Sequence, residues 1–308
     1  MKCTKCGGVA VIGMPQHRLQ LCAEHFADWV PSMVQRAIEK YRMFTPEQRI
    51  LVAVSGGKDS LTLWDVLIRL GYQTEGLYIN LGITTEDYSD VSQQRVEAFA
   101  AQHGSLPLRV VNVRDTYGQA TPDLARARRA RGGRHTCSAC GLVKRHIMNQ
   151  VAHEGGYAAI ATGHNVDDEA AVLVQNVLHW QASYLKRQAP VLPEAHGGLA
   201  RKVKPLCHLY ERETAAYAFV RGIEFAELEC PYSVGAKTIF YKGLLNQLER
   251  RSPGAKSSFY LSFLQAKEQG LFTPDEEGEA VFGICRKCGQ PTTAGDLCAF
   301  CRLWESMS

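Results

Sequence analysis

The sequence predicts an α/β fold, in which helices cover both faces of a mostly parallel sheet and a small cysteine-rich module flanks each end. Two observations predict this fold. Short apolar runs alternate with segments whose apolar residues recur at helical spacing, as in repeated βα units. Both ends of the chain instead carry cysteines paired as C-x-x-C. We expect three domains, at residues 1–28, 29–280 and 281–308.

Length and composition indicate a folded cytoplasmic protein. The chain has 308 residues, of which 45% are hydrophobic, enough to bury a sizeable core. No apolar run approaches the ~18 residues of a membrane span. The N-terminus lacks the apolar core of a signal peptide. We therefore expect no membrane partner. The net charge of +4 is compatible with a nucleic-acid partner but does not establish one.

The central elements follow in order along the chain. Residues 50–54 (ILVAV) form a continuous apolar run, typical of a strand buried on both faces. Apolar residues then recur from Leu61 to Leu70, which predicts a helix that ends at Gly71. The same criteria predict strands at 73–80, 107–113 and 157–162, helices at 89–103, 142–151 and 170–178, and two helices within 230–260 broken at 252–254.

The joint between the first strand and its helix has the composition of a phosphate-binding turn. Its six residues are Ser55, Gly56, Gly57, Lys58, Asp59 and Ser60. The glycines let the backbone approach a ligand, and the start of a helix presents free N–H groups and a positive dipole end. The lysine adds a cation and the serines add hydroxyl donors. We assign the aspartate to a bridging magnesium ion, because an acid does not bind phosphate directly. We expect this turn to be exposed.

Cysteine spacing at the two ends predicts two structural zinc sites. Each end supplies two ligand pairs, and four soft ligands suit tetrahedral zinc. In a reducing compartment such pairs favour metal over disulfides. A glycine after the first knuckle of each module provides a tight turn. The predicted ligands are Cys3, Cys6, Cys22 and His25 in one module, and Cys285, Cys288, Cys298 and Cys301 in the other.

Three further cysteines have a different arrangement. Cys137 and Cys140 form a C-x-x-C pair before an expected helix, and the remote Cys230 precedes a proline. Three thiolates suit a zinc ion with an open position, or three corners of a [4Fe–4S] cluster with one open iron. A redox disulfide between Cys137 and Cys140 is the remaining alternative. Cys207 has no partner in the sequence, and we expect a buried inert thiol.

A second polar cluster, Gly163–Glu169, follows the strand expected at 157–162. Ligands of parallel sheets bind beyond the carboxyl ends of the strands, so this cluster and residues 55–60 can face one site. The three acids at 167–169 also open a helix, where acids are favoured in any case.

A basic segment directly precedes Cys137. Such a run is usually a solvated or disordered surface, whereas its position directly before Cys137 argues for a contact to nucleic-acid phosphates, and both interpretations stay open. Its arginines are Arg126, Arg128, Arg129, Arg131 and Arg134.

Together these motifs resemble those of the TtuA-type tRNA 2-thiouridine synthetases, in the PP-loop ATP pyrophosphatase superfamily. The matching segments are SGGKDS (55–60), HTCSACGLVKR (135–145), ATGHNVDDEA (161–170), LHW (178–180), CPYS (230–233) and both terminal modules. The resemblance implies that ATP adenylates the 2-oxygen of a tRNA uridine and that sulfur replaces this oxygen. It also implies a thiocarboxylated ubiquitin-like protein as sulfur donor, and a homodimer.

The resemblance further implies roles for individual residues. Cys137, Cys140 and Cys230 would hold a [4Fe–4S] cluster whose open iron carries sulfide. Lys144 and Asp168 match the catalytic lysine and aspartate of the family, and whether Asp168 holds Mg²⁺ or acts as a base stays open. Residues 55–60 and Lys144 would bind ATP and its metal ion, together with Ala53, Asn80 and Gly163.

Three other functions remain as alternatives. A tRNA 2-thiocytidine synthetase shares the PP-loop and the three cysteines but does not account for two terminal zinc modules. A PP-loop synthetase of the amidotransferase kind has no use for Cys137, Cys140 and Cys230. A non-catalytic zinc-ribbon protein that binds RNA or senses redox state has no use for residues 55–60.

Overall fold

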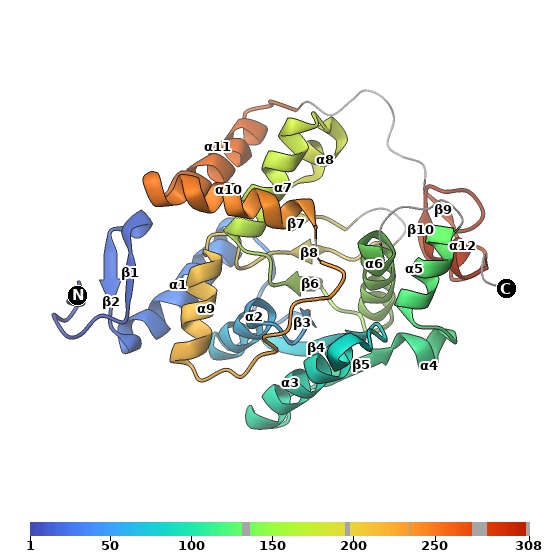
Figure 1. Ribbon diagram of the computed structural model, residues 1–308, viewed down its shortest axis with the longest axis horizontal. Coiled ribbons are helices and arrows are strands. Elements are labelled where there is room, and N and C mark those ends of the chain that lie inside the picture. Colours follow the sequence, from blue (N-terminus) through green and yellow to red (C-terminus); the bar gives the residue numbers. More distant parts are fainter. Residues whose placement is uncertain (131–135, 195–197, 234, 273–281, 306–308) are drawn as a thin grey trace.

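The computed structural model describes residues 1–130, 136–194, 198–233, 235–272 and 282–305. Its centre is a six-stranded sheet with helices on both faces, and a small module lies at each end of the molecule (Figure 1). This is the predicted fold class. The strands of the sheet are β3 (Arg49–Val54), β4 (Gln73–Asn80), β5 (Leu108–Asn112), β6 (Ala159–Thr162), β7 (Val191–Leu192) and β8 (Lys202–Val203).

The sheet has a topological switch point between β3 and β6. The strand order is β5-β4-β3-β6-β8-β7, and all neighbours are parallel except β7 and β8. From β3 the chain adds β4 and β5 on one side and then crosses to add β6 on the other. The loops after β3 and β6 therefore diverge at this point. A crevice forms there at the carboxyl ends of the strands, the usual ligand position in such sheets.

The predicted helices are present with shifted ends. They are α1 (Ala23–Lys40), α2 (Lys58–Arg69), α3 (Tyr88–Gln102), α4 (Val113–Tyr117), α5 (Thr121–Ala130), α6 (Thr136–Glu154), α7 (Val166–Leu178), α8 (Ala182–Arg187), α9 (Glu211–Val220), α10 (Lys237–Arg251), α11 (Ala255–Glu268) and α12 (Ala299–Glu305), with short 3₁₀ turns η1 (Pro15–His17) and η2 (Thr85–Asp87). Of these helices, α1, α4, α5, α8, α9 and α12 were not predicted. Helix α2 begins earlier than expected, because the extended backbone of Gly57 already caps it. Lys58 and Asp59 therefore lie in its first turn.

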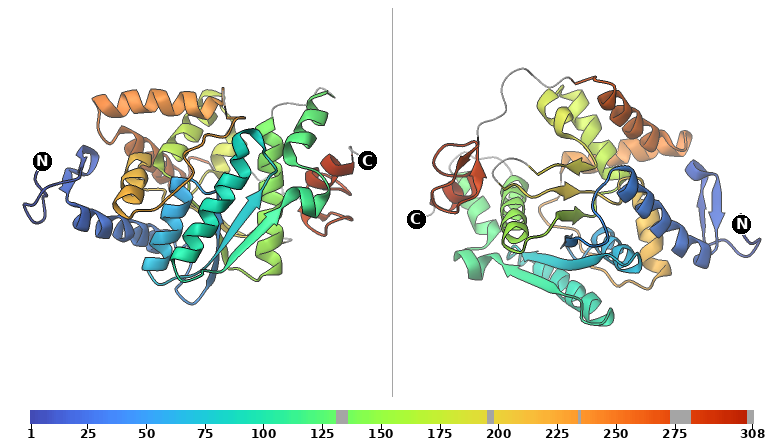
Figure 2. Two further views of the ribbon diagram at one scale, coloured as in Figure 1. Left: turned by 60° about the horizontal axis from the view of Figure 1, so that its bottom comes forward. Right: turned by 180° about the vertical axis from the view of Figure 1, so that it is seen from behind.

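Alternation along β3 sorts the core into two layers. Ile50, Val52 and Val54 pack with residues of α1, α2, α3 and α9, whereas Leu51 packs with Val143 of α6 on the other face. Successive strand side chains point to opposite faces, which produces this division. The two views of Figure 2 show the helices on both sides of the sheet. The central strand is thus buried on both faces, as its apolar run predicts.

The terminal modules join the central fold in different ways. In the first, the hairpin of β1 (Ile12–Met14) and β2 (Leu19–Leu21) leads into α1, so the expected boundary after residue 28 falls inside a continuous helix. In the second, β9 (Gly283–Ile284) pairs with β10 (Pro291–Thr292), and α12 packs on α5 and α6. Phe300 of α12 stacks on His146 with ring centroids 3.6 Å apart. Burial lowers the pKa of His146 to about 4, which keeps this contact uncharged near neutral pH.

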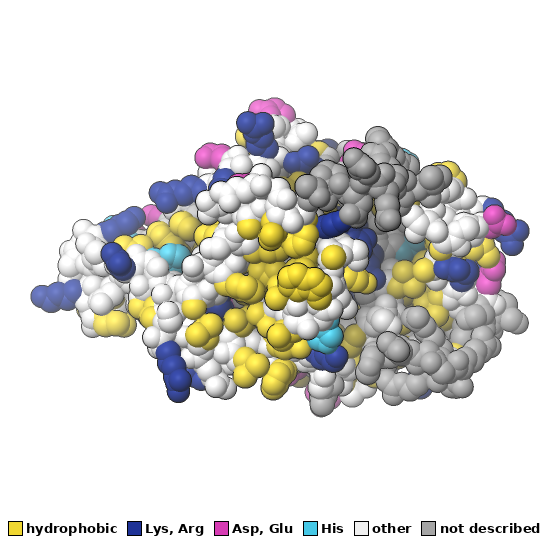
Figure 3. Space-filling model, turned by 90° about the horizontal axis from the view of Figure 1, so that it is seen from above, with side chains coloured by type: hydrophobic (Ala, Val, Ile, Leu, Met, Phe, Trp, Pro, Cys, Tyr) yellow, Lys and Arg dark blue, Asp and Glu magenta, His cyan; other side chains and the backbone are white. Residues whose placement is uncertain are grey.

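The outer surface carries exposed apolar side chains. Figure 3 shows hydrophobic side chains gathered at the centre of the face seen from above. Helix α10, near the top of Figure 1, contributes the exposed residues Ile239, Phe240, Leu244 and Leu248. Exposed apolar groups of this number provide a surface for contact with another molecule. Over the described ranges, no helix combines the length and the hydropathy that crossing a membrane requires.

Candidate active site

A cavity of about 400 Å³ lies at the carboxyl ends of β3 and β6. Both polar segments predicted to face one site line it, together with side chains from β4, α3 and α6. Its lining residues are Ala53, Val54, Ser55, Asp59, Ser60, Leu77, Tyr78, Ile79, Leu81, Tyr88, Ser89, Lys144, Met148, Thr162, Gly163, His164 and Asp168. The fold thus brings together most of the residues to which the sequence assigned ATP binding or catalysis.

In the glycine loop (residues 55–60), position 56 accepts only glycine. Gly56 has φ +78°, and a Cβ there would lie 2.5 Å from the carbonyl oxygen of Ser92. A side chain is therefore excluded for two reasons. Gly163, at the end of β6, approaches the loop so closely that a Cβ would lie 3.0 Å from the backbone of Asp59. The loop after β3 is therefore packed directly against the end of β6, on the other side of the crevice.

Two serines of the loop have different roles. Ser60 accepts a hydrogen bond from the backbone N–H of Ser55 at 3.0 Å and donates one to the carbonyl oxygen of Gly57 at 2.9 Å. Its hydroxyl proton is thus used inside the loop. Ser55 Oγ lies 3.2 Å from Ser60 Oγ and is exposed at the cavity, so of the two predicted donors Ser55 is the one that faces the space where a phosphate would bind.

Lys58 and Asp59 face helix α9 as well as the cavity region. Asp59 accepts hydrogen bonds from Lys58 at 3.1 Å, from the Asn165 amide at 3.3 Å and from the Thr214 hydroxyl. Burial raises the pKa of Asp59, although Lys58 and Thr214 oppose this shift. Lys58 also bonds Glu211 at 2.8 Å and does not line the cavity. The loop is thus less exposed than its sequence predicts, because α9 packs over it.

Asp168 lies in the first turn of α7, where a capping box holds it. The Asn165 side chain accepts hydrogen bonds from the N–H groups of residues 167 and 168, and Asp168 Oδ2 accepts one from Asn165 N–H at 3.1 Å. Lys242 Nζ lies 2.6 Å from the other oxygen, Oδ1, and 3.0 Å from Glu211.

The buried charges around Glu211 stabilise one another. Burial disfavours the charge on Lys242, but Asp168 and Glu211 outweigh it and raise the pKa of the lysine. Burial likewise opposes ionisation of Glu211, but hydrogen bonds and charges from Lys58 and Lys242 lower the pKa of this carboxyl to about 2. Burial also disfavours the charge on Lys58, but nearby opposite charges outweigh it and raise the pKa of this lysine, so Lys58, Lys242 and Glu211 are charged near neutral pH.

Two other predicted residues have contrasting positions. Lys144 is exposed and lines the cavity, one turn along α6 from Cys140. Asn80 is buried at the end of β4, and its amide donates to Asp90 at 3.1 Å and to Gln93 at 2.9 Å. Asn80 does not line the cavity but ties β4 to the start of α3.

Cys137, Cys140 and Cys230 gather beside this cavity. Cys137 Sγ donates to the carbonyl oxygen of Tyr232 at 3.2 Å, which joins the start of α6 to the segment after Cys230. Burial raises the pKa of the Cys140 thiol to about 11; Lys144 opposes this shift, and Cys230 and Cys137 add to it. Burial, Cys230 and Cys140 also raise the pKa of Tyr88, which lines the cavity. Cys140 and Cys230 therefore lie near Tyr88 of the cavity wall, and Cys137 lies near Cys140.

Cys207 lies apart from these three cysteines. It is fully buried in the core layer with α1 and α9, whereas Cys140 and Cys230 pack against the layer on the other face of the sheet. The prediction that Cys207 is buried is confirmed. The sheet separates it from Cys140 and Cys230.

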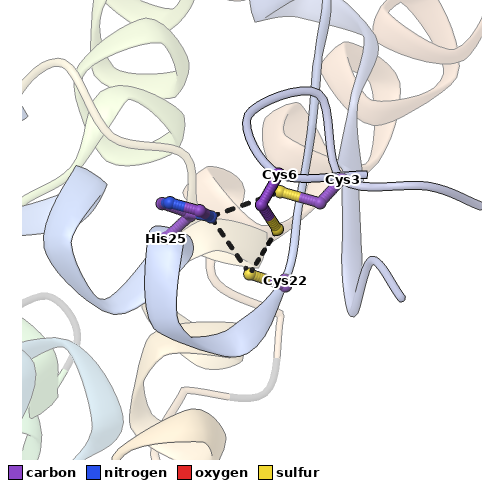
Figure 4. A group of neighbouring side chains, drawn as sticks. All are labelled: Cys3, Cys6, Cys22 and His25. Carbon is purple, nitrogen blue, oxygen red and sulfur yellow. Dashed lines mark hydrogen bonds between the residues drawn. The ribbon is translucent and has the colours of Figure 1, made fainter. Parts of the chain in front are cut away.

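The terminal tetrads are compact. The four ligand atoms of each lie within 4.8 Å of one another. Figure 4 shows Cys3, Cys6, Cys22 and His25 pointing toward one centre, with His25 Nδ1 3.2 Å from Cys22 Sγ. The expected turn after the first knuckle is present, since Gly7 has φ +74°.

The C-terminal tetrad has the same kind of turn, at Gly289 with φ +70°. The N–H of Cys298 donates to Cys285 Sγ at 3.3 Å, and the N–H of Cys301 donates to Cys298 Sγ at the same distance. Burial opposes ionisation of Cys285, but backbone donors outweigh it and lower the pKa of this thiol to about 6. Such donors favour the thiolate that metal binding requires.

Comparison with known proteins identifies the family. Residues 2–27 match the family described as "2-thiouridine synthetase TtuA, N-terminal LIM domain", and residues 30–230 match the PP-loop domain. The chain belongs to the TtuA family of PP-loop proteins. A protein of Thermus thermophilus named tRNA-5-methyluridine(54) 2-sulfurtransferase is 50% identical over 100% of this chain and 92% of its own. A protein of the same name from Thermotoga maritima is 40% identical over 98% of this chain and 96% of its own.

A solved structure shares the fold of this TtuA-family chain. The U34-tRNA thiolase NcsA from Methanococcus maripaludis, described with its [4Fe–4S] cluster, aligns with a TM-score of 0.81. The alignment covers 100% of this chain and 97% of that one at 22% sequence identity. At this identity the likeness supports the fold, including both ends of the chain.

Sequence reasoning missed several side chains of this TtuA-family site. Asn165 carries a readable signal, since Asn followed by Asp three residues later, just before an apolar helix, resembles a capping box. Thr214, Glu211 and Lys242 carry none, because only the packing of α9 and α10 brings them to the loop.

The basic segment before Cys137 is only partly described. Arg126 on α5 is exposed and pairs with Asp123. Arg131 and Arg134 lie outside the described residues, as do the side chains of Arg128 and Arg129. The expected contact with nucleic acid therefore stays a prediction.

Proposed function

We propose that this chain is a tRNA 2-sulfurtransferase that uses ATP to convert a uridine to 2-thiouridine. The observation that carries the proposal is the single cavity at the β3–β6 crevice. Its lining joins the glycine loop to Lys144 and Asp168, and three thiols stand beside it. Phosphate-binding and sulfur chemistry thus share one site. The names of the relatives in Thermus and Thermotoga support the same reaction.

The proposed reaction has two steps. The uracil O2 attacks the α-phosphorus of ATP, a new O–P bond forms, and the bond to the β-phosphate oxygen breaks to release pyrophosphate. A sulfide nucleophile then adds at C2, and the carbon–oxygen bond breaks with AMP as the leaving group. Adenylation is required because an amide-like oxygen is a poor leaving group, whereas AMP is a good one. The products are 2-thiouridine, AMP and pyrophosphate.

The residues around the cavity suit the first step. The backbone of the glycine loop and the hydroxyl of Ser55 would bind the phosphates. Lys144 would stabilise the negative charge that gathers on the transferring α-phosphoryl group, and preorganised charge of this kind is a large term in catalysis. Asp59 and Asp168 supply the carboxylate oxygens that Mg²⁺ prefers. We assign Mg²⁺ to these two, since both line the cavity.

The cysteines beside the cavity fit a [4Fe–4S] cluster better than a single zinc ion. Zinc gathers its ligand atoms around one centre, but within the described ranges only the terminal tetrads have three or more such atoms within 4.8 Å. A cluster binds each cysteine at a separate iron, which suits the wider spacing of Cys137, Cys140 and Cys230. When bound, such a cluster would supply an open iron that carries sulfide.

We assign two structural zinc ions to the terminal tetrads. Four converging ligand atoms and backbone N–H donors to sulfur fit zinc at both ends. A ubiquitin-like thiocarboxylate as sulfur donor and a homodimer follow from the family resemblance. The exposed apolar residues of α10 supply a surface that a second subunit or the sulfur donor would contact.

Nucleoside mass spectrometry tests the proposed function. Anaerobically prepared protein, incubated with unmodified tRNA, Mg·ATP and sulfide, is expected to yield 2-thiouridine together with equal amounts of AMP and pyrophosphate. Omission of ATP or tRNA should abolish all three products. A protein with full iron and zinc that releases no AMP in the presence of tRNA would contradict the proposal.

A further inference from the structure

Four charged side chains form a continuous chain of ion pairs beside the cavity. Lys58 Nζ lies 2.8 Å from Glu211 Oε1, and Lys242 Nζ lies 3.0 Å from Glu211 Oε2. Lys242 then reaches Asp168 Oδ1 at 2.6 Å. Each residue comes from a different helix, namely α2, α9, α10 and α7. The chain of ion pairs therefore links the glycine loop to the opposite edge of the crevice.

Lys242 has a position that distinguishes it from the residues discussed above. It belongs to α10 (Lys237–Arg251), beyond residues 30–230 that match the PP-loop domain. It does not line the cavity, whereas Asp168 does. The Lys242 side chain is 23% exposed and that of Asp168 25%, so water screens the pair less than a surface pair. Lys242 therefore meets the cavity directly through Asp168, and meets the glycine loop only indirectly, through Glu211 and Lys58.

Both oxygens of Asp168 are held. Oδ2 accepts from the N–H of Asn165 within its own helix cap, and Oδ1 faces Lys242. The cap alone leaves one oxygen without a fixed direction. Lys242 supplies a contact to this second oxygen. With both oxygens held, the carboxylate group cannot rotate about its bond to the side chain. Glu211 in turn fixes Lys242 through their ion pair. Glu211 is itself held, because its backbone N–H donates a hydrogen bond to Asp167 at 2.9 Å.

We propose that Lys242 is a positioning residue for adenyl transfer, which orients the Asp168 carboxylate toward the cavity through the Glu211-linked chain of ion pairs. This inference rests on the proposed function, because Asp168 must act in that reaction for its orientation to matter. Loss of Lys242 should have a large effect on turnover, because a displacement of about 1 Å in a catalytic group can lower the rate about 100-fold.

The first test separates turnover from binding. In Lys242→Met, the kcat for tRNA-dependent AMP formation should fall about 10- to 100-fold, whereas the KM for Mg·ATP should rise by less than kcat falls, because Asp168 keeps its carboxylate and loses only its orientation. Lys242→Arg should restore part of the loss, because it keeps the cation. Lys237→Met is the matched control, as Lys237 is exposed at the start of the same helix and forms no ion pair within the described ranges. Unchanged kcat in Lys242→Met would overturn the inference.

A double-mutant cycle supplies a result that a purely structural role would not produce. Once Asp168→Asn has removed the group being positioned, adding Lys242→Met should lower kcat no further. Additive losses would overturn the inference. Glu211→Gln offers a second route if Lys242→Met does not fold. It weakens the hold on Lys242 without touching Asp168, so its kcat should fall less than that of Lys242→Met. Because it also removes the charge paired with Lys58, the KM for Mg·ATP is measured beside kcat. An unchanged kcat would also overturn the inference.

The outcomes distinguish this inference from the function on which it rests. A wild-type protein that forms no AMP with tRNA contradicts the proposed function itself. A wild-type protein that forms AMP, beside a Lys242→Met variant with equal kcat, contradicts only the role of Lys242.

Discussion

The terminal cysteines and the central cysteines of this chain are organised in opposite ways. Each terminal tetrad gathers its ligand atoms within 4.8 Å from a short hairpin and an adjoining turn or helix. Cys137, Cys140 and Cys230 come from segments about ninety residues apart, and Cys137 is exposed. Local sequence thus assembles the tetrads, whereas the whole domain assembles the trio. We therefore expect the tetrads to serve folding and the trio to serve chemistry.

Removing one terminal ligand should produce the largest effect on stability. In Cys288→Ser the C-terminal module should unfold, because a module this small draws on the order of 10 kcal/mol of its folding free energy from zinc. Elemental analysis should find two zinc ions per chain in the wild type and one in the variant. Calorimetry should still detect ATP, since the glycine loop lies elsewhere. A native protein that contains no zinc would contradict the assignment of structural zinc to the terminal tetrads.

Removing one central ligand should abolish activity with little loss of stability. Serine at Cys137, Cys140 or Cys230 should eliminate the iron, which we expect at roughly four per chain, and with it thiolation. The thermal midpoint and ATP binding should persist, because these thiols do not hold the fold together. Exposure of the wild type to air should have the same result.

Cys207→Ser is the matched control for the central cysteines. Its thiol is buried on the other face of the sheet, so iron content and thiolation should be unchanged, with a stability cost of about 1–3 kcal/mol for the buried hydroxyl. Full activity in Cys230→Ser, or in protein reconstituted without iron, would contradict a chemical role for the trio.

Lys144 tests whether the helix that carries two of the central cysteines also acts on ATP. Lys144→Ala should lower kcat for AMP formation about 100-fold while tRNA affinity changes little, because charge stabilisation acts mainly in the transition state. Single-turnover kinetics with a tRNA-binding titration would measure both. Arg145→Ala, at the next position on α6 and outside the cavity lining, is the control. Wild-type turnover in Lys144→Ala would leave the cavity without its proposed cation.

Asp59 tests the opposite edge of the cavity, where we expect the smallest effect. Asp59→Asn can still accept the Thr214 hydrogen bond and removes the charge, so the loop should keep its shape. Calorimetry should show Mg·ATP bound about 10-fold more weakly, as expected for losing one charged contact. Asp59→Ala should bind more weakly still, because the contacts to Thr214 and Asn165 are lost as well. Equal affinity in Asp59→Asn and the wild type would exclude a metal-binding role.

Much of this protein is readable from local sequence. The apolar run 50–54, the glycine loop and the helix signals predict β3, α2 and their joint, and short-range C-x-x-C spacing predicts both tetrads. The break at residues 252–254 separates α10 from α11 as expected. These features depend on neighbours within a few residues, or on the period of a single element. Their physical causes are therefore present in short segments.

Other features depend on contacts between distant segments. Nothing near Glu211 or Lys242 in the sequence signals that they reach the glycine loop and Asp168, because the packing of α9 over α2 and α10 over α7 places them there. The same packing half-buries Asp59, which the sequence alone predicts to be exposed. The sheet also decides that Cys207 lies on the opposite face from Cys140 and Cys230. A linear pattern records residue types, but charge pairing and burial depend on which surfaces meet.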